Sequence, residues 1–289
     1  MTNPQVNAQR KAELLSSTVE HIDIKSFDAR PIIDQMGKMS FTSRDLANAT
    51  GIYNQMLADK DCTIFLVIAG STSAGGCMDL YAELLRNNMV DAIVATGATI
   101  VDMDFFEALG FKHYQAAGEV DDNVLRENYI DRIYDTYIDE EELQACDHTI
   151  LELANALEPR GYSSREFIHE MGKWLAAGNA KKKGSLIQTC YEEGVPIFCP
   201  AFVDSSAGFG LVKHQVDRAK AGQPYMMLDA IAGETGMGQW GYAVARAVTD
   251  ERHKNRVNIL ALDGHTLFSR SPPADGDWKD ALRWLPGAP

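Results

Sequence analysis

Two mostly apolar runs in the first third of the chain each have the length of one β-strand. They cover residues 62–68 (CTIFLVI) and 90–95 (VDAIVA). Runs of this kind are typical of parallel strands that are buried on both faces of a sheet. Between them, Leu80, Leu84 and Leu85 recur at helical spacing. The pattern therefore predicts a strand–helix–strand unit with a right-handed parallel crossover.

The alternation of strands and helices continues to about residue 230. Short apolar segments predict strands at 195–199 and 225–228. Helices are expected at 140–157 and 164–177, the second with Ser163 or Ser164 as its N-cap. This alternation predicts an α/β fold built on one mostly parallel sheet that is flanked by helices.

The composition of the chain changes near Gly233. Residues 1–232 contain 20 Lys+Arg and 34 Asp+Glu, which accounts for the whole net charge of −14, whereas residues 233–289 contain seven of each. Within this last part we expect a helix at 242–253, a strand at 257–262 and a short helix at 277–285. We therefore interpret the chain as a single domain with three parts: an extension over 1–20, a core over 20–232 and a divergent tail over 233–289.

Charge and hydropathy exclude several classes of protein. A net charge of −14 argues against nucleic acid, whose binding proteins present basic surfaces. It would either steer polycations such as polyamines toward the protein or simply keep the protein in solution. No apolar run reaches the roughly 18–20 residues of a membrane-spanning helix. The polar beginning of the chain has no apolar signal region, which favours a cytoplasmic protein with no membrane association.

Cysteine and histidine usage argues against a disulfide framework and against a metal site. The five cysteines are widely spaced and include no CxxC pair, a pattern that fits a reducing compartment. Cys62 and Cys199 lie in or beside apolar runs, where a small buried thiol is expected. The histidines have no metal-ligand spacing and are expected at structural or surface positions; they include His113, His148, His169, His253 and His265.

Small and polar residues follow three of the predicted strands. These turns begin at Gly70, Thr96 and Asp204. In a doubly wound sheet, ligands bind outside the carboxyl ends of the strands, where backbone N–H groups and helix N-termini can face phosphate. Asp102, just beyond the second turn, could accept hydrogen bonds from ribose hydroxyls. The alternatives are that the turns are merely tight and that Asp204 forms an Asx-turn or a helix N-cap.

Four ordered motifs in the core resemble those of deoxyhypusine synthases. They are residues 61–66 (DCTIFL), 88–91 (NMVD), 126–133 (RENYIDRI) and 195–201 (VPIFCPA). The segment from Ile22 to Met56 is also similar to the N-terminal region of that family. Residues 96–102 (TGATIVD) are most similar to the bacterial deoxyhypusine synthase-like branch. The resemblance covers roughly residues 20–232.

The resemblance implies a Rossmann-like fold, a homotetramer and an NAD-dependent transferase. Members of the family oxidise and cleave spermidine, and they pass its aminobutyl group to a lysine of a protein or to a small amine. The resemblance also implies a set of cofactor-binding positions in the three turns: Gly70, Ser71, Ser73, Ala74, Thr96, Gly97, Ala98, Asp102, Asp204 and Ser205. The first turn departs from the family's usual Thr-Ser-Asn and contains Ala69-Gly70-Ser71 instead.

The divergent tail lacks the segment that carries the family's catalytic lysine, and no catalytic residue is identified. Lys213 has the wrong context and is interpreted as an ordinary surface residue of a helix, and Lys279 lacks the accompanying glycine. Phe209 stands where the family usually has an acidic residue for the polyamine. Three hypotheses follow: an aminobutyltransferase that uses polyamines, a nucleotide-binding pseudoenzyme, or a truncated or frame-changed copy whose sequence breaks after Ala232.

Overall fold

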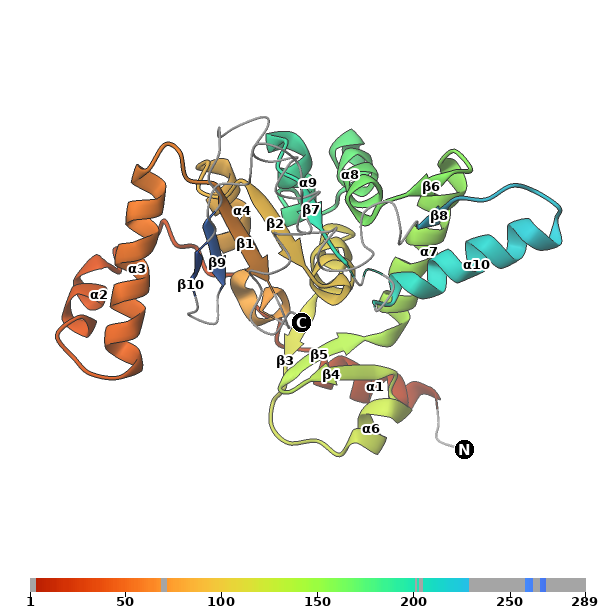
Figure 1. Cartoon of the computed structure of the whole chain (residues 1–289). Coiled ribbons are helices and arrows are strands. Elements are labelled where there is room, and N and C mark those ends of the chain that lie inside the picture. The colour runs from red at the N-terminus through yellow and green to blue at the C-terminus, as the bar shows by residue number, and fades with distance from the viewer. Residues whose placement is uncertain are drawn as a thin grey trace, which may run out of the picture.

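A computed structural model describes residues 4–68, 72–200, 202, 205–228, 258–261 and 266–268. Its largest sheet has five strands in the order β10-β9-β1-β2-β7. Strands β9, β1, β2 and β7 are parallel to one another, and β10 is antiparallel to β9. The expected mostly parallel sheet with flanking helices is therefore confirmed (Figure 1). The strands of this sheet are β1 (Ile64–Ile68), β2 (Ala92–Ala95), β7 (Ile197–Phe198), β9 (Asn258–Ala261) and β10 (Thr266–Phe268).

The two apolar runs form the centre of this sheet. Leu66 pairs with Ile93 and Val67 pairs with Val94, so β1 and β2 run side by side in the same direction. Leu66 and Ile93 are both buried. They belong to one hydrophobic cluster that extends into the surrounding helices. Burial of both faces of the sheet explains why these strands are continuously apolar rather than alternating.

The helices follow the predicted positions closely. The segment at 140–157 forms α7 (Glu140–Ala156) and the segment at 164–177 forms α8 (Ser164–Trp174). Ser163 caps α8 through a reciprocal capping box with Glu166, which confirms the expected N-cap. The remaining helices are α1 (Pro4–Leu14), α2 (Arg30–Met36), α3 (Thr42–Ala58), η1 (Ser73–Cys77), α4 (Met78–Arg86), η2 (Ala98–Phe105), α5 (Phe106–Ala108), α6 (Asp122–Glu127), η3 (Leu175–Asn179), α9 (Leu186–Glu193) and α10 (Ala207–Lys220).

The structure also contains a small antiparallel sheet that was not predicted, which lies below the main sheet in the view of Figure 1. It contains β3 (His113–Gln115), β5 (Thr136–Asp139) and β4 (Ile130–Ile133), in that order across the sheet. Leu14 at the end of α1 packs in a cluster with Leu125, Ile130 and Tyr137. Figure 1 shows α1 and α6 beside this sheet. The first helix of the chain is therefore joined to the body of the protein by this second core.

One extended segment links the small sheet to the main one. Gln115 N donates to Ser17 O at 2.7 Å, and Val19 N donates to His113 O at 2.8 Å. Three residues later, Ile22 N donates to the carbonyl oxygen of Gly76 at 2.9 Å, in the turn that follows β1. Residues 17–22 thus contact β3 with one half and the turn after β1 with the other.

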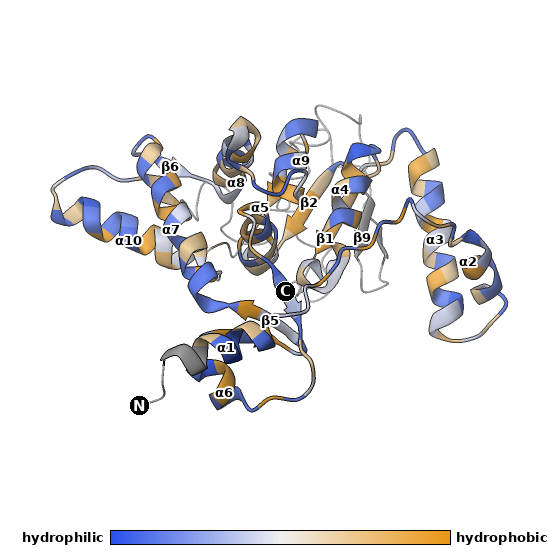
Figure 2. Ribbon diagram, turned by 180° about the vertical axis from the view of Figure 1, so that it is seen from behind, coloured by the Kyte–Doolittle hydropathy of each residue, from blue (hydrophilic) through white to orange (hydrophobic). Residues whose placement is uncertain are grey.

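The helices α2 and α3 lie apart from the rest of the molecule, on the far side from α10 (Figure 1). Figure 2 shows orange, hydrophobic positions along both helices. Phe41 is 88% exposed and Ile32 is 64% exposed. Tyr53 of α3 secures the pair to the body by donating from its hydroxyl to Met89 O at 2.8 Å.

The later segments are confirmed in part. The strand expected at 225–228 is observed as β8 (Met227–Leu228), but it pairs with β6 (Gly161–Tyr162) in a separate two-stranded sheet. The strand expected at 257–262 is observed as β9, and the helices expected at 242–253 and 277–285 lie outside the described residues. Cys62 and Cys199 are buried, as predicted, and no disulfide joins any of the five cysteines, all of which lie in the described ranges. None of the helices in the described ranges combines the length and hydropathy needed to cross a bilayer.

Candidate functional site

The three strands that precede the polar turns have their carboxyl ends at one edge of the main sheet. Strands β1, β2 and β7 are mutually parallel, so their carboxyl ends point the same way. The segments that follow them begin at residues 69, 96 and 199. Of the expected cofactor positions, Gly70, Ser71 and Asp204 lie outside the described residues. The other seven belong to these same three segments or to the helix η2 that continues the second turn.

Two of the expected cofactor-binding residues lie after β1, in the buried first turn of a short helix. Ser73 and Ala74 are both buried at the beginning of η1. The hydroxyl oxygen of Ser73 has no hydrogen-bond partner among the described residues. Gly76 has a φ of 96°, and a Cβ atom there would lie 2.7 Å from Glu20 O. Only glycine fits this position, because the N-terminal segment passes directly over the turn.

The turn after β2 is fixed by its own hydroxyl groups and by close contact with the third turn. The hydroxyl oxygens of Thr96 and Thr99 are 3.0 Å apart, and Thr99 N donates to Thr96 Oγ1 at 3.3 Å. A Cβ atom on Gly97 would lie 2.6 Å from the carbonyl oxygen of Phe202 and 2.9 Å from Ser205 Oγ. The absence of a side chain at Gly97 therefore lets the second and third turns touch.

Asp102 in η2 is tied to the start of α10. Its Oδ1 atom accepts hydrogen bonds from the backbone N–H of Ser206 at 3.1 Å and from the Ser206 hydroxyl at 2.7 Å. Burial raises the pKa of the Asp102 carboxyl, and the two bonds from Ser206 partly offset that rise. A carboxylate has capacity for further acceptor contacts, so these bonds leave Asp102 able to accept from a ligand hydroxyl.

A second carboxyl group shares this environment. Burial raises the pKa of Asp147 in α7 to about 6, and the charge of nearby Asp102 adds to the rise. Its Oδ1 atom is buried without a hydrogen-bond partner among the described residues. Sequence reasoning missed both Asp147 and Ser206. Ser206 adjoins an expected position, but nothing in the sequence links Asp147 to residue 102.

The other residues singled out in the sequence fall outside this cluster. Lys213 lies on the exposed side of α10 and pairs with Asp217 at 2.7 Å, as expected of a surface residue. Phe209, in the first turn of α10, is 76% exposed. Lys279 lies outside the described residues. Across the ranges that the structure describes, no group of three or more His, Cys, Asp or Glu side chains could hold a metal ion.

The sequence of this chain is similar to that of several known proteins. The deoxyhypusine synthase family model matches residues 31–245. A deoxyhypusine synthase-like protein of Caulobacter vibrioides is 74% identical over 230 residues, which cover 80% of this chain and 63% of the relative. A deoxyhypusine synthase-like protein of Coxiella burnetii is 73% identical over 206 residues, covering 71% of this chain and 58% of the relative.

A solved structure has the same overall fold. A protein described as a deoxyhypusine synthase from Entamoeba histolytica superposes with a TM-score of 0.54 at 16% identity, covering 88% of this chain and 85% of that one. This chain spans about three fifths of the length of the two curated relatives named above. The family model nevertheless covers well over half of the chain, including all three edge turns. The chain belongs to the deoxyhypusine synthase family.

Proposed function

We propose that this chain binds NAD at the carboxyl edge of its main sheet. The observation that carries the proposal is the strand order. After β1 the chain adds β2 and β7 on one side, and β9 then returns to the other side of β1. In open parallel sheets, ligands bind in the crevice outside the carboxyl ends of the strands, at the point where the order reverses. Here that point is the end of β1.

The residues at this edge suit a dinucleotide. The buried hydroxyl of Ser73 has no hydrogen-bond partner among the described residues, and it stands at the start of a helix, where backbone N–H groups favour phosphate. Ala98 has only a small side chain, and Gly97 lets the third turn lie directly against the second. Asp102 supplies a carboxylate for ribose hydroxyls. In our proposal Gly70, Ser71, Ser73 and Ala74 face the phosphates, with Thr96, Asp204 and Ser205 completing the site.

On this basis we assign to the chain the aminobutyl-transfer chemistry of its family, with spermidine as donor and a lysine or a small amine as acceptor. When bound, NAD supplies a hydride acceptor for oxidation of the polyamine. The chain's own contribution is to hold the cofactor at the strand ends and to attract the polycation. Its net charge of −14 supports the second role. A cytoplasmic homo-oligomer, a tetramer by resemblance to the family, completes the proposal.

A second candidate function is a catalytically impaired nucleotide-binding protein or a truncated or frame-changed copy. No segment after Ala232 is recognisable as the one that carries the family's lysine, and Lys213, whose sequence context resembles that of the family lysine only in part, lies in a surface ion pair. Covalent catalysis of this kind needs an uncharged amine held within reach of the oxidised carbon. This candidate keeps the NAD site and lacks the transfer step.

Two measurements on the full chain separate these candidates. Calorimetric titration with NAD tests the cofactor site. Incubation with spermidine and NAD, reduction with borohydride and peptide mass spectrometry then test for an aminobutyl group on a lysine. Binding together with an adduct supports the transferase, and binding without an adduct supports the impaired protein. Absence of NAD binding by the folded chain would overturn both.

A further inference from the structure

A pocket of about 360 Å³ lies away from the turns at the carboxyl edge. It is bounded by the N-terminal segment near His21, the stretch from Gly110 to His113, and the loop that precedes α9. None of the expected cofactor-binding residues lines it. Its volume lies at the lower end of the range for small-molecule sites, which is about 300–1,000 Å³.

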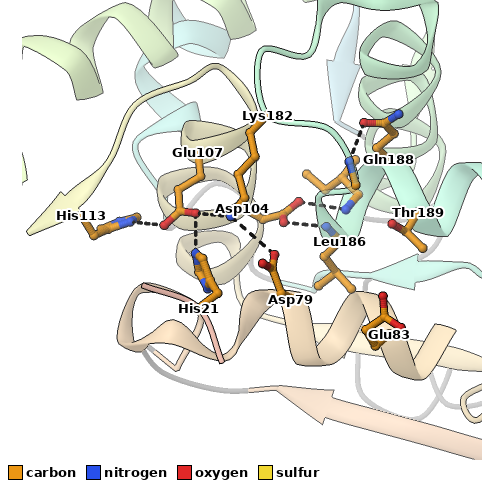
Figure 3. A network of polar contacts seen from close by, with 12 residues as sticks. His21, Asp79, Glu83, Asp104, Glu107, His113, Lys182, Leu186, Gln188 and Thr189 are labelled. Carbon is orange, nitrogen blue, oxygen red and sulfur yellow. Dashed lines mark hydrogen bonds and ion pairs between the residues drawn. The ribbon is translucent and has the colours of Figure 1, made fainter. Parts of the chain in front are cut away.

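A buried carboxylate organises the wall of this pocket. Glu107 of α5 accepts hydrogen bonds from His21 Nε2 at 2.6 Å, His113 Nδ1 at 2.8 Å and Lys182 Nζ at 2.9 Å (Figure 3). Burial alone would raise the pKa of Glu107, but these three hydrogen bonds lower it well below its ordinary value. The carboxylate is therefore ionised, and both histidines must donate to it.

A second buried acidic residue, Asp104, anchors the far end of the loop that carries Lys182. Asp104 accepts hydrogen bonds from the backbone N–H groups of Leu186 and Ile187 at 2.7 and 2.8 Å, which ties the start of α9 to η2 (Figure 3). Lys181 N and Lys182 N both donate to Ala108 O. Hydrogen bonds therefore hold the loop that carries Lys181 and Lys182 at both ends. The loop forms a fixed wall of the pocket.

The side chains that line the pocket carry an excess of positive charge. Lys112, Lys181 and Lys182 face Glu107 on the wall and Asp79, which lies outside the lining and pairs with Lys182 at 3.5 Å (Figure 3). Three positive and two negative charges leave one positive charge when both histidines are neutral. Lys112 and Lys181 are exposed, and neither forms an ion pair with a carboxylate in the described part of the chain. This local excess contrasts with the net charge of −14 of the whole protein.

The two histidines add unused polar atoms to the same wall. His21 Nδ1 and His113 Nε2 are buried, and neither has a hydrogen-bond partner among the described residues. The His21 and His113 side chains are only 8% and 0% exposed. Buried polar atoms without partners are uncommon in folded proteins and call for a specific explanation. Because the other nitrogen of each ring donates to Glu107, these atoms accept hydrogen bonds when the ring is neutral and can donate to a phosphate oxygen only when the ring takes up a second proton.

We propose that this pocket binds the phosphate group of a small organic phosphate. Lysines pair with phosphate oxygens through charge-assisted hydrogen bonds, and the exposed Lys112 and Lys181 are available for such bonds. Inorganic phosphate alone would fill only part of the volume. Val19 and Phe111 also line the pocket and offer apolar atoms to the organic part of the ligand, close to Lys181, whose Nζ atom lies 5.7 Å from the centroid of the Phe111 ring. This inference is independent of the proposed NAD site.

The test is calorimetric titration of the full chain with glycerol 3-phosphate and, separately, with inorganic phosphate. We expect saturable binding of both, with the organic phosphate binding more tightly. Replacement of Lys112 and Lys181 together by glutamine should weaken binding at least about tenfold, because charge-assisted hydrogen bonds are lost. The double replacement by arginine should retain most of it. Lys213→Gln, which removes an equivalent exposed charge on α10, is the control and should bind normally.

Nuclear magnetic resonance of the histidine rings locates the ligand. The ring signals of His21 and His113 should shift on addition of glycerol 3-phosphate, whereas that of the exposed His148 should not. Absence of saturable binding would overturn the proposal, as would equal affinity in the glutamine variant. Competition by NAD would also overturn it, because the pocket would then be part of the nucleotide site. A chain that binds the phosphate but not NAD would leave this inference standing and remove the proposed function.

Discussion

Asp102 and Ser206 are 104 positions apart in the sequence and are joined by two hydrogen bonds to one carboxylate oxygen. The pair connects the helix that follows β2 with the first turn of α10. It therefore fixes the distance between the second and third edge turns. In the proposed site, the same carboxylate has two tasks: it holds the third turn in place and it accepts hydrogen bonds from a ribose.

The two tasks of Asp102 can be separated by substitution. Asp102→Ala should lower the free energy of unfolding by about 1–3 kcal/mol, because Ser206 loses its acceptor in a largely buried place. Asp102→Asn keeps an acceptor oxygen and should cost less stability. If Asp102 contacts the ribose, both variants should bind NAD about tenfold more weakly. Ser206→Ala is the control, since it removes one hydrogen bond and keeps the carboxylate. Unchanged NAD affinity in a folded Asp102→Asn variant would contradict the ribose role.

The contact between the second and third turns requires glycine at position 97. In Gly97→Ala, the new methyl group would lie 2.6 Å from the Phe202 carbonyl oxygen and must push the two turns apart. We expect a loss of about 1–3 kcal/mol of unfolding free energy in urea titrations, together with weaker NAD binding. Gly75→Ala is a matched control in the first turn, because nothing lies within 4 Å of the added carbon. Equal stability of the two variants would show that the turns do not need to touch.

The network around Glu107 should be costly to break. Glu107→Gln removes the charge that three donors share, and its amide N–H₂ group would face one of them. We expect a loss of about 3 kcal/mol in unfolding free energy, since breaking a buried ion pair leaves the other charges without compensation. Glu13→Gln, which breaks an exposed pair with Arg10, should cost less than about 1 kcal/mol.

The Glu107 network also has a defined pH dependence. The pKa of Glu107 is lowered in the folded protein, so its stabilising effect is complete above the pKa of the unfolded chain. That effect is lost progressively as the pH falls from there toward the lower pKa of the folded protein. The stability difference between the wild type and Glu107→Gln should therefore shrink in acid. A difference that stays constant down to about pH 3 would contradict this account.

Asp147 should behave in the opposite sense. Its pKa is raised to about 6 in the folded protein, so ionisation of this group at higher pH destabilises the fold. Asp147→Asn should be more stable than the wild type at about pH 8 by about 1 kcal/mol, a value reduced for partial exposure. At about pH 4 the two proteins should be nearly equal. Urea titrations at the two pH values measure the difference, and a variant that is less stable at the higher pH would refute the assigned cause.

The sequence predicted those parts of the fold that depend on local patterns. Strands β1 and β2 were visible as apolar runs, and α8 was visible from its capping serine. The β4–β5 hairpin was not predicted, because its two-residue loop is Tyr134-Asp135 and lacks the Asn-Gly type of signal. Tyr134 adopts a positive φ of 51° there. The tight loop is therefore imposed by the pairing of the strands rather than by local preference.

The polar sites of the protein likewise include one part that the sequence predicts and another that it does not. The edge turns were predictable, since parallel strands bring their carboxyl ends together and small residues follow each strand. The partners of Glu107 were not, because His21 lies 86 positions away and Lys182 lies 75 positions away. No periodicity encodes a contact of that kind. His113 was expected at a structural or surface position, and its near-complete burial against a carboxylate is what makes it part of a charged network.

The pairing of β1 with both β2 and β9 has a consequence for the synthesis of the protein. Ile68 ends β1, and Asn258 begins β9 190 positions later. At a ribosomal rate of about 5–20 residues per second, the partner for the second side of β1 emerges roughly 10–40 s after β1 itself. During that interval a five-residue apolar strand, Ile64–Ile68, exposes one unpaired edge that another nascent chain could join. Correct assembly of the protein therefore depends on how that edge is shielded while the ribosome completes the chain.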